Sequence, residues 1–481
     1  MRQYSPTLVW FRSDLRLRDN PALVDAVAHG GPIVPLFVLD SQSPGPHAPG
    51  GAGQWWLYHA LRTLADALDR HGTPLVLRRG PADRVVPAVA DEVGASTVVW
   101  NRLYEPWANA RDGRIKAVLR EQGLHVASHN GRLLAEPWAI KTGSDAPYKV
   151  FTPYWKAFQA RVEPAEPLPE PAHIPGGATA ESEMLDDWKL TPAAPDWASG
   201  LRATWTPGEA GAQARLHDFL DTGLASYPEL RNRPDTAGTS RLSPHLHWGD
   251  VSPRQVWAAT RARMAAEPAL DSAGWDFLRE LVWREFSYHL LYWWPDIPET
   301  TWKTAFHAFP WRYDTDAYAA WTAGRTGYPI VDAGMRELWT TGWMHNRVRM
   351  IVGSFLVKDL LLPWQWGERW FWDTLVDADL ANNSASWQWV AGCGADAAPY
   401  FRIFNPVTQG RKFDPQGAYV RTWVPELAKL ASKHIHAPWQ APELELASAG
   451  VRLGETYPRP IVDHSAARKR ALAAFEQVKT G

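Results

Sequence analysis

Hydrophobic positions in the first 130 residues follow two alternating periods. Short apolar runs rich in β-branched residues, such as TLVWF and PIVPLFVLD, predict buried strands. Between such runs, four leucines from Leu57 to Leu68 recur at spacings of four, three and four, the apolar stripe of an amphipathic helix. Strands that alternate with helices predict right-handed βαβ units. We therefore expect residues 1–130 to form an α/β domain with a doubly wound parallel sheet.

Local signals refine this prediction without giving the domain a ligand. The runs PLVLRRG and STVVWNRLY predict two further strands, and Asn20 before Pro21 predicts the start of a helix. No G-x-G-x-x-G and no G-x-x-x-x-G-K-[ST] follows the first strand. A glycine loop that grips a nucleotide is therefore not supported, and the ligand of this domain stays open.

The pattern changes twice farther along the chain. Between Glu163 and Pro207, prolines and glycines interrupt both periods, which is typical of a long connector. From Gly208 onward strand signals vanish and helical periods dominate, as in FLRELVWREFSYHLLYW. We expect a connector over residues 131–207 and a nearly all-helical domain over 208–481.

Composition narrows the classes of protein that fit. A chain of 481 residues with 45% hydrophobic and 21% charged residues is typical of a two-domain globular protein. The single cysteine, Cys393, excludes an intramolecular disulfide and cannot supply the thiolates of a zinc or iron–sulfur site. We expect no metal, no membrane span and a reducing, cytoplasmic location.

Net charge gives no indication of a binding site, whereas the tryptophan content is unusual. A net charge of −2 gives no overall footprint for a polyanion, so any nucleic-acid site must be local. Tryptophan is abundant, with 29 residues, of which ten precede residue 206 and nineteen lie between Trp248 and Trp439. Core packing does not need so many indoles.

The segment GTSRLSPHLHW contains a cluster of hydroxyls around a cation. Thr239, Ser240 and Ser243 surround Arg241 just before a predicted helix, a composition that suits a phosphate or diphosphate. Serine and threonine are also the ordinary caps of a helix. The segment by itself leaves both interpretations open.

A second cluster lies in ELVWREF. Glu280, Trp283 and Arg284 occupy positions i, i+3 and i+4, so an acid, an aromatic ring and a cation share one helical face. The alternative is an intrahelical ion pair beside a core tryptophan, which is common and weakly stabilising.

Two later segments favour a site over packing. GWMHNRVRM places Asn346 and Met350 four apart on a predicted helix, with two arginines between them. DADLANNSASWQW brings two acids, an asparagine pair and two tryptophans into one short stretch. Unpaired polar groups are costly in a helical core, so this density indicates a binding site for a polyfunctional ligand.

Six strings in chain order resemble the photolyase and cryptochrome family. They are WFRSDLRLRDNPAL, GTSRLSP, ELVWREF, GYPIVDAGMRELWTTGWMHNRVRM, GERWFWDTLVDADLANNSASWQW and PYFRIFNPVTQG. The resemblance covers nearly the whole chain and lies nearest to class I-type enzymes that repair cyclobutane pyrimidine dimers. It implies an antenna-binding domain over 1–130 and a helical FAD-binding catalytic domain over 208–481.

The resemblance assigns residues to the cofactor. Those implied to line FAD are Tyr227, Thr239, Ser240, Arg241, Leu242, Ser243, Glu280, Arg284, Asn346, Arg349, Asp377, Asp379 and Asn383. Arg349 and Asp377 resemble the ion pair beside the isoalloxazine, and Asn383 resembles the residue that faces flavin N5. Plant cryptochromes typically carry aspartate there, so an amide favours repair over signalling.

The resemblance also implies the electron path and the substrate pocket. Trp387, Trp364 and Trp311 match a chain that carries electrons from the surface to photoexcited oxidised flavin. The dimer pocket is implied at Glu280, Trp283, Asn346, Met350 and Trp389, and contacts with the DNA backbone are implied at Arg231, Arg347 and Arg402. In the implied reaction, light-excited FADH⁻ transfers an electron to a flipped-out dimer in UV-damaged DNA, and the electron returns after the ring splits.

Several alternatives stay open. Enzymes that repair (6-4) photoproducts carry a His-His pair where this chain has His345 and Asn346. A cryptochrome-like photoreceptor would share the flavin and the tryptophans. A second chromophore, either folate, deazaflavin or flavin, is implied near WNRLYEPW, with Tyr104 and Glu105 as candidate contacts. A monomer is expected.

Overall fold

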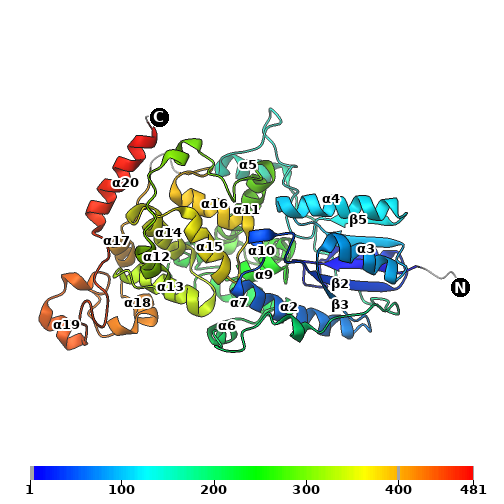
Figure 1. Ribbon diagram of the computed structural model, residues 1–481, viewed down its shortest axis with the longest axis horizontal. Helices are drawn as coiled ribbons and strands as arrows, with labels where there is room; N and C mark the ends of the chain where they lie inside the picture. The colour runs from blue at the N-terminus through cyan, green and yellow to red at the C-terminus, as the bar shows by residue number, and fades with distance from the viewer. Residues whose placement is uncertain (1–4, 398–400, 480–481) are drawn as a thin grey trace.

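The predicted parallel sheet forms one end of the elongated molecule (Figure 1). The structure, a computed structural model, describes residues 5–397 and 401–479. Five parallel strands run in the order β3-β2-β1-β4-β5 and span β1 (Thr7–Phe11), β2 (Ile33–Leu39), β3 (Val76–Arg79), β4 (Thr97–Asn101) and β5 (His125–His129). Strand β1 pairs with β2 on one side and with β4 on the other, so the direction of strand succession reverses between β1 and β4. A crevice therefore opens at the carboxyl ends of β1 and β4.

Helices cover both faces of this sheet, as the alternating pattern predicts. They are α1 (Pro21–Ala28), α2 (Gly51–Asp69), α3 (Ala82–Glu92) and α4 (Pro106–Glu121). Asn20 caps α1, since its side chain accepts a hydrogen bond from the Leu23 amide at 3.1 Å. The predicted leucine stripe of α2 is buried in the core under the sheet. The doubly wound α/β class is confirmed.

Strand β5 was not among the predicted strands. Its sequence, HVASH, contains two histidines and a serine, and Val126 is its only fully buried residue. An edge strand with one buried apolar side chain gives almost no alternating signal.

The proline-rich connector packs against both domains, since its backbone bonds to the sheet domain and two of its helices contact helices of the second domain. It contains α5 (Phe151–Arg161), η2 (Leu185–Trp188) and α6 (Ser199–Thr204). Its backbone exchanges hydrogen bonds with the sheet domain, including one from Ile33 to Pro175 at 2.7 Å and one from Asp19 to Leu168 at 2.9 Å. Proline keeps its carbonyl acceptor although it lacks a donor, so such a segment can still dock on a folded domain.

From Gly208 onward the described chain consists of helices and loops, and its one β element is an isolated bridge between Leu453 and Tyr457. The helices are α7 (Glu209–Asp218), α8 (Tyr227–Leu230), α9 (Ser243–Trp248), α10 (Pro253–Ala266), α11 (Asp271–Trp293), α12 (Thr315–Thr322), α13 (Pro329–Thr341), α14 (Asn346–Ser354), α15 (Trp364–Thr374), α16 (Leu380–Ala391), α17 (Pro406–Phe413), α18 (Ala418–Trp423), α19 (Glu443–Ala449) and α20 (His464–Lys479). Two π-helical turns, η3 (Phe219–Gly223) and η6 (Phe355–Asp359), extend α7 and α14.

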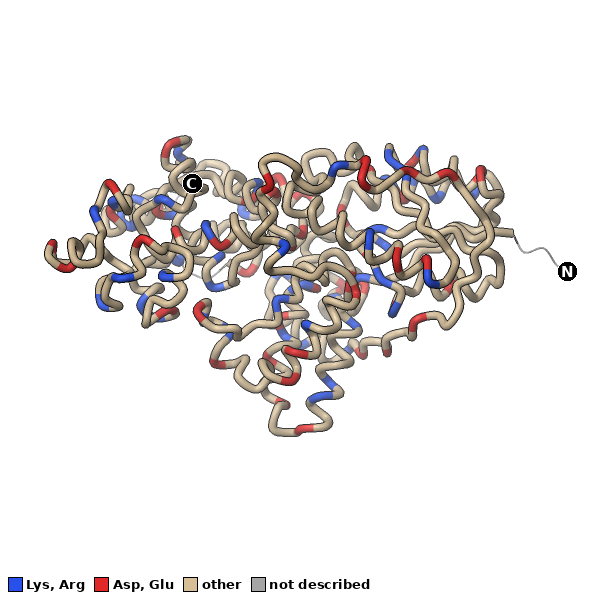
Figure 2. Tube along the Cα trace, turned by 90° about the horizontal axis from the view of Figure 1, so that it is seen from below, with Lys and Arg blue, Asp and Glu red and all other residues tan. Residues whose placement is uncertain are grey.

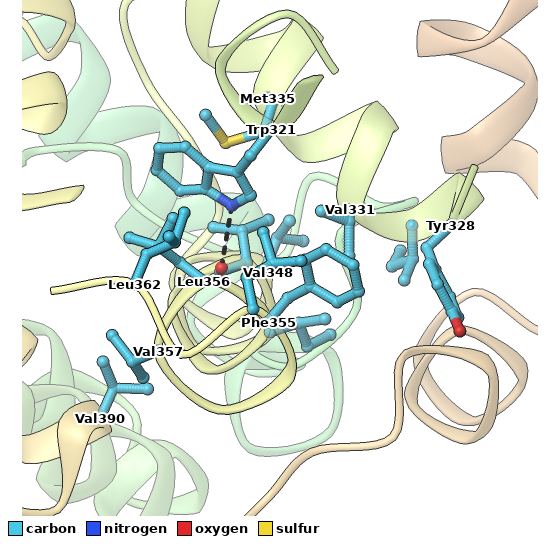
Figure 3. Close-up of a cluster of buried hydrophobic side chains, with 14 of the residues drawn as sticks. Trp321, Tyr328, Val331, Met335, Val348, Phe355, Leu356, Val357, Leu362 and Val390 are labelled. Atoms are coloured by element: carbon cyan, nitrogen blue, oxygen red, sulfur yellow. Dashed lines mark hydrogen bonds between the residues drawn. The ribbon is translucent and has the colours of Figure 1, made fainter. Parts of the chain in front are cut away.

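The core of the helical domain forms around Trp321. This indole is fully buried, and its Nε1 donates a hydrogen bond to the Val352 carbonyl at 3.1 Å, drawn as the dashed line in Figure 3. Apolar side chains from α13, α14 and η6 surround it (Figure 3). The buried donor is thereby satisfied within an otherwise apolar cluster.

A buried arginine joins the two domains. Arg16 is 1% exposed and donates to the carbonyls of Asp19 and Gly131 at 2.7 Å and of Gly249 at 2.9 Å. Gly249 has a φ of +76°, and a Cβ there would lie 2.3 Å from the Ser13 carbonyl oxygen. The junction therefore requires glycine at this position.

Basic and acidic residues are interspersed over both domains (Figure 2). This distribution agrees with the net charge of −2. Among the described helices, none combines the length and the apolar character needed to span a bilayer.

Candidate functional site

The hydroxyl cluster lies in the turn that enters α9. Thr239 and Ser240 are half-buried, Leu242 is buried and Ser243 is exposed. Leu242 occupies the cap position and makes no side-chain capping bond, so the capping interpretation is not observed. The hydroxyls of Thr239 and Ser240 stay available for a ligand.

Arg241 in the same turn has a left-handed backbone, with φ of +51°. Its guanidinium lies 4.5 Å above the Trp343 ring and 3.7 Å from the Glu337 carboxylate. Trp343 in turn donates from Nε1 to Ser243 Oγ at 3.2 Å. Strained non-glycine residues are found where the surroundings fix them, often at binding sites.

His345 forms the other side of this corner and was not assigned a role from the sequence. Its Nδ1 accepts the Arg347 amide at 3.1 Å and caps α14. Burial, with the nearby charges of Arg241 and Arg347, lowers the pKa of His345 to about 3. The neutral ring must therefore carry its proton on Nε2, which is buried and has no hydrogen-bond partner in the described chain. A buried donor without a partner indicates a position where a ligand completes the bond.

The predicted ion pair between α14 and the segment before α16 is formed. Arg349 Nη2 lies 2.8 Å from Asp377 Oδ2, and the Asp377 side chain is 3% exposed. Arg349 Nε also donates to the Met344 carbonyl at 2.8 Å. A buried charge pair of this kind requires good geometry to offset its desolvation.

Asp379 is held by the protein itself. Its Oδ1 accepts the Asn382 amide at 2.9 Å as the cap of α16, and its Oδ2 accepts the Tyr288 hydroxyl. Burial raises the pKa of Asp379, but hydrogen bonding and charge from His247, together with nearby arginines, hold it well below its usual range. The carboxylate is ionised and positions the helix that carries Asn383.

Asn383 faces a carboxyl that the sequence did not reveal. Its Nδ2 donates to both the carbonyl oxygen and Oε1 of Glu368, each at 3.1 Å, and both residues are buried. Burial raises the pKa of Glu368 to about 7, against the lowering effect of this hydrogen bond. Because Glu368 accepts hydrogen bonds from the amide nitrogen, the side-chain oxygen of Asn383 points away from Glu368.

The three tryptophans of the predicted electron chain belong to one core cluster. Trp364 and Trp387 are buried at 0% and 3% exposure, and Trp311 is half-buried at its edge. Two members of the predicted chain are therefore interior, and Trp311 alone reaches toward solvent. In the described chain, the Trp387 ring packs against the rings of Phe371 and Trp321, with centroids 4.9 Å and 6.3 Å away.

Glu280 pairs with an arginine on another segment. Its Oε1 lies 2.7 Å from Nη2 of Arg231, whose guanidinium lies 5.2 Å from the Tyr227 ring. Arg284 instead donates to the Arg132 carbonyl at 2.9 Å. The alternative of an intrahelical pair between Glu280 and Arg284 is therefore not what the structure contains.

The predicted substrate tryptophans lie on α11 and α16, two helices that pack against each other. Trp283 stacks on Phe151 with ring centroids 3.5 Å apart and an interplanar angle of 10°. Trp389 donates from Nε1 to the Asp396 carbonyl at 3.1 Å. At the start of α14, Asn346 is exposed, and Met350 one turn later is half-buried.

Arg347 lies close enough to the other two predicted DNA arginines for their charges to act on it. Burial, and then repulsion from Arg231 and Arg402, lowers the pKa of Arg347. Arg347 donates to Asn232 Oδ1 at 2.7 Å from Nη2. The structure thus gathers these cations into one basic cluster. Pro399 and Tyr400, which open the string PYFRIFNPVTQG, lie outside the described residues.

A separate cleft lies between the domains at the carboxyl ends of the strands. Its lining includes Trp10, Glu105, Trp107 and Arg111 from the α/β domain and Trp372 from α15. The Arg111 guanidinium lies 4.8 Å and 5.0 Å from the rings of Trp10 and Trp107. Of the two candidate antenna contacts, Glu105 lines this cleft.

Tyr104, the other candidate antenna contact, is 1% exposed and does not line the cleft. Its hydroxyl donates to Glu136 Oε2 at 2.9 Å. Within the described residues, no group of three or more His, Cys, Asp or Glu side chains is arranged to hold a metal ion.

Comparisons with known proteins cover both domains. Residues 7–172 match the family model for DNA photolyase, and residues 277–477 match the FAD binding domain of DNA photolyase. The chain is 52% identical over 476 residues to a deoxyribodipyrimidine photo-lyase of Agrobacterium fabrum, in a match that covers 99% of this chain and 98% of the relative. It is 40% identical to Cryptochrome-1 of Arabidopsis thaliana, over 98% of this chain and 70% of the relative.

Among solved structures, a bacterial class III photolyase from Agrobacterium tumefaciens is similar at a TM-score of 0.97 and 51% identity. The match covers 100% of this chain and 99% of that one. That relative is a class III enzyme, whereas the sequence motifs resemble the class I type.

Proposed function

The chain belongs to the photolyase and cryptochrome family, and from that premise we propose that it is a deoxyribodipyrimidine photo-lyase, which splits cyclobutane pyrimidine dimers in DNA under blue light. The observation that carries the proposal is the amide of Asn383, whose Nδ2 donates to Glu368 Oε1 at 3.1 Å. An amide adds no full negative charge beside a reduced flavin. Full-length identity of 52% to a photo-lyase supports the same conclusion.

Residues on three segments fit FAD. The unpartnered Nε2–H of His345 and the hydroxyls around Arg241 suit the diphosphate. The pair of Arg349 and Asp377 and the carbonyl of Asn383 suit the isoalloxazine. When bound and reduced, FAD supplies the electron that light drives into the dimer.

Glu280 and Arg231 act on the substrate in this proposal. The Glu280 carboxyl hydrogen-bonds the dimer, and the guanidinium 2.7 Å away fixes its direction. The positive charge of Arg231 offsets the carboxylate while negative charge develops on the dimer, which is electrostatic stabilisation by a group already in place.

The basic cluster of Arg231, Arg347 and Arg402 binds phosphates beside the lesion. Three phosphate contacts make the affinity fall steeply with salt. A dimer stacks and pairs poorly, so extruding it into a pocket costs less than flipping an intact base. The indoles of Trp283 and Trp389 then supply aromatic walls for the extruded dimer.

A second chromophore occupies the interdomain cleft in this proposal. Trp107 and Trp372 offer flat apolar surfaces, and Glu105 offers a hydrogen-bond acceptor. Folate, deazaflavin and flavin all contain a flat heteroaromatic ring. Absorbance and fluorescence of the chromophore released from purified protein distinguish them, and a preparation that releases only FAD would contradict this part of the proposal.

The central test is repair of a single-stranded oligonucleotide that contains a thymine dimer. Reduced holoenzyme should restore thymine absorbance under blue light and not in the dark. Glu280→Gln should lower the repair yield with FAD retained. Asp276→Asn, one turn earlier on α11 and paired with Arg279, is the matched control and should repair normally.

The second candidate is a cryptochrome-like photoreceptor, favoured by the 40% identity to Cryptochrome-1. Absence of repair despite bound, reduced FAD would support it, provided that an oligonucleotide with a (6-4) photoproduct is not repaired either. We also propose a monomer, which the elution volume of the holoenzyme in size-exclusion chromatography tests.

A further inference from the structure

The loop after α16 contains a residue with an uncommon backbone. Asp396 has φ of +50°, a left-handed conformation that residues with a side chain adopt rarely. Such a conformation persists where surrounding contacts fix it. The contacts of Asp396 are therefore informative.

Asp396 bonds to two segments that are far apart in the sequence. Its backbone carbonyl accepts the Nε1–H of Trp389 at 3.1 Å. Its carboxylate Oδ2 accepts the backbone N–H of Phe151, the first residue of α5, at 3.4 Å. One residue thus connects α16 with the connector segment.

Phe151 extends this connection to α11. Its ring stacks on Trp283 at 3.5 Å between centroids, so one face of that indole is covered. A base that contacts Trp283 must therefore use its other face or its edge. Both tryptophans are half-buried, and an indole that reaches toward solvent has rotamer freedom unless neighbours hold it.

We propose that Asp396 is a positioning residue that sets the spacing of Trp283 and Trp389 as the two walls of the dimer pocket. It holds one indole directly and the other through Phe151. This inference rests on the proposed function, in which these tryptophans flank the flipped dimer. Ordering a loose side chain on binding opposes affinity, so walls fixed in advance improve substrate binding.

The predicted signature is a change in KM without a change in the light-driven step. Asp396→Ala removes the carboxylate and should raise the KM for dimer-containing oligonucleotide about five- to tenfold, the effect of losing one hydrogen bond. The light-saturated kcat of pre-reduced holoenzyme should stay unchanged. Asp396→Asn is the matched control, because asparagine keeps an acceptor oxygen and tolerates the left-handed backbone, and it should keep a KM near that of the wild type.

A second variant tests the other half of the connection. Phe151→Leu keeps the backbone N–H but removes the stacked ring, and it should also raise KM. The double variant should be less impaired than the product of the two single effects, because both changes release the same indole. FAD content and thermal unfolding of each variant show whether it is folded.

The outcomes separate this inference from the function on which it rests. A wild-type KM in Asp396→Ala overturns it, and so does an equal rise in Asp396→Asn. If Asp396→Ala does not fold, a wild-type KM in Phe151→Leu overturns it instead. If wild-type holoenzyme neither binds nor repairs the dimer, the proposed function fails, and the inference fails with it.

Discussion

Helix α15 passes so close to Trp387 that only glycine fits at the crossing. A Cβ added to Gly367 would lie 2.1 Å from Cη2 and 2.5 Å from Cζ3 of that indole. The ring cannot withdraw, because Phe371 and Trp321 pack against it and the residue is 3% exposed. Gly367→Ala should therefore displace either the helix or the indole.

The magnitude follows from two opposing effects. Overpacking of a well-filled core costs about 1–3 kcal/mol, and an overlap of this size lies at the upper end. Replacing a helical glycine with alanine returns about 1 kcal/mol. The net destabilisation of Gly367→Ala is therefore about 2 kcal/mol. Gly113→Ala on α4 is the matched control, because its added Cβ meets nothing within 4 Å and should stabilise the protein.

Two assays test this reasoning. Thermal unfolding should give a Tm several degrees below wild type for Gly367→Ala and no decrease for Gly113→Ala. Photoreduction of oxidised holoenzyme should slow in Gly367→Ala, since Trp387 is the first donor of the proposed chain, while repair by pre-reduced enzyme persists. If Gly367→Ala unfolds and photoreduces like Gly113→Ala, the packing argument is refuted.

Three further predictions concern the electron chain, a buried carboxyl and the domain junction. Trp311→Phe should block photoreduction, measured by flavin absorbance, and leave repair by pre-reduced enzyme intact; normal photoreduction would show that the chain is misassigned. The pKa of Glu368 is raised from 4.5 to about 7, so its ionisation destabilises the fold as pH rises through 7. Glu368→Gln should therefore raise the free energy of unfolding more at pH 8.5 than at pH 5, by up to about 3 kcal/mol, and the rise in Tm should differ in the same direction. An equal rise in Tm at both pH values would count against a buried neutral carboxyl. Arg16→Met should cost about 3–5 kcal/mol, because three buried carbonyls lose their donor, whereas Arg18→Met at an exposed position should unfold with a Tm near wild type.

The sequence by itself determined the elements whose signals are local. The alternation of strand and helix periods, the Asn20 cap and the leucine stripe from Leu57 to Leu68 depend on neighbours a few residues away. The composition of the motifs likewise identified the segments that meet in the helical domain. Local periodicity could not reveal β5, because its edge position leaves only Val126 fully buried.

Only the tertiary structure decided the partners of the site residues. Glu280 pairs with Arg231 rather than with Arg284 one turn away, because the chain folds the end of α8 against α11. Asn383 faces Glu368 on the neighbouring helix. Contacts of this kind join segments that are distant in sequence, and no local pattern encodes their distance or direction. The sequence therefore identified the types of side chain in the site, and packing between helices determined how those side chains are arranged.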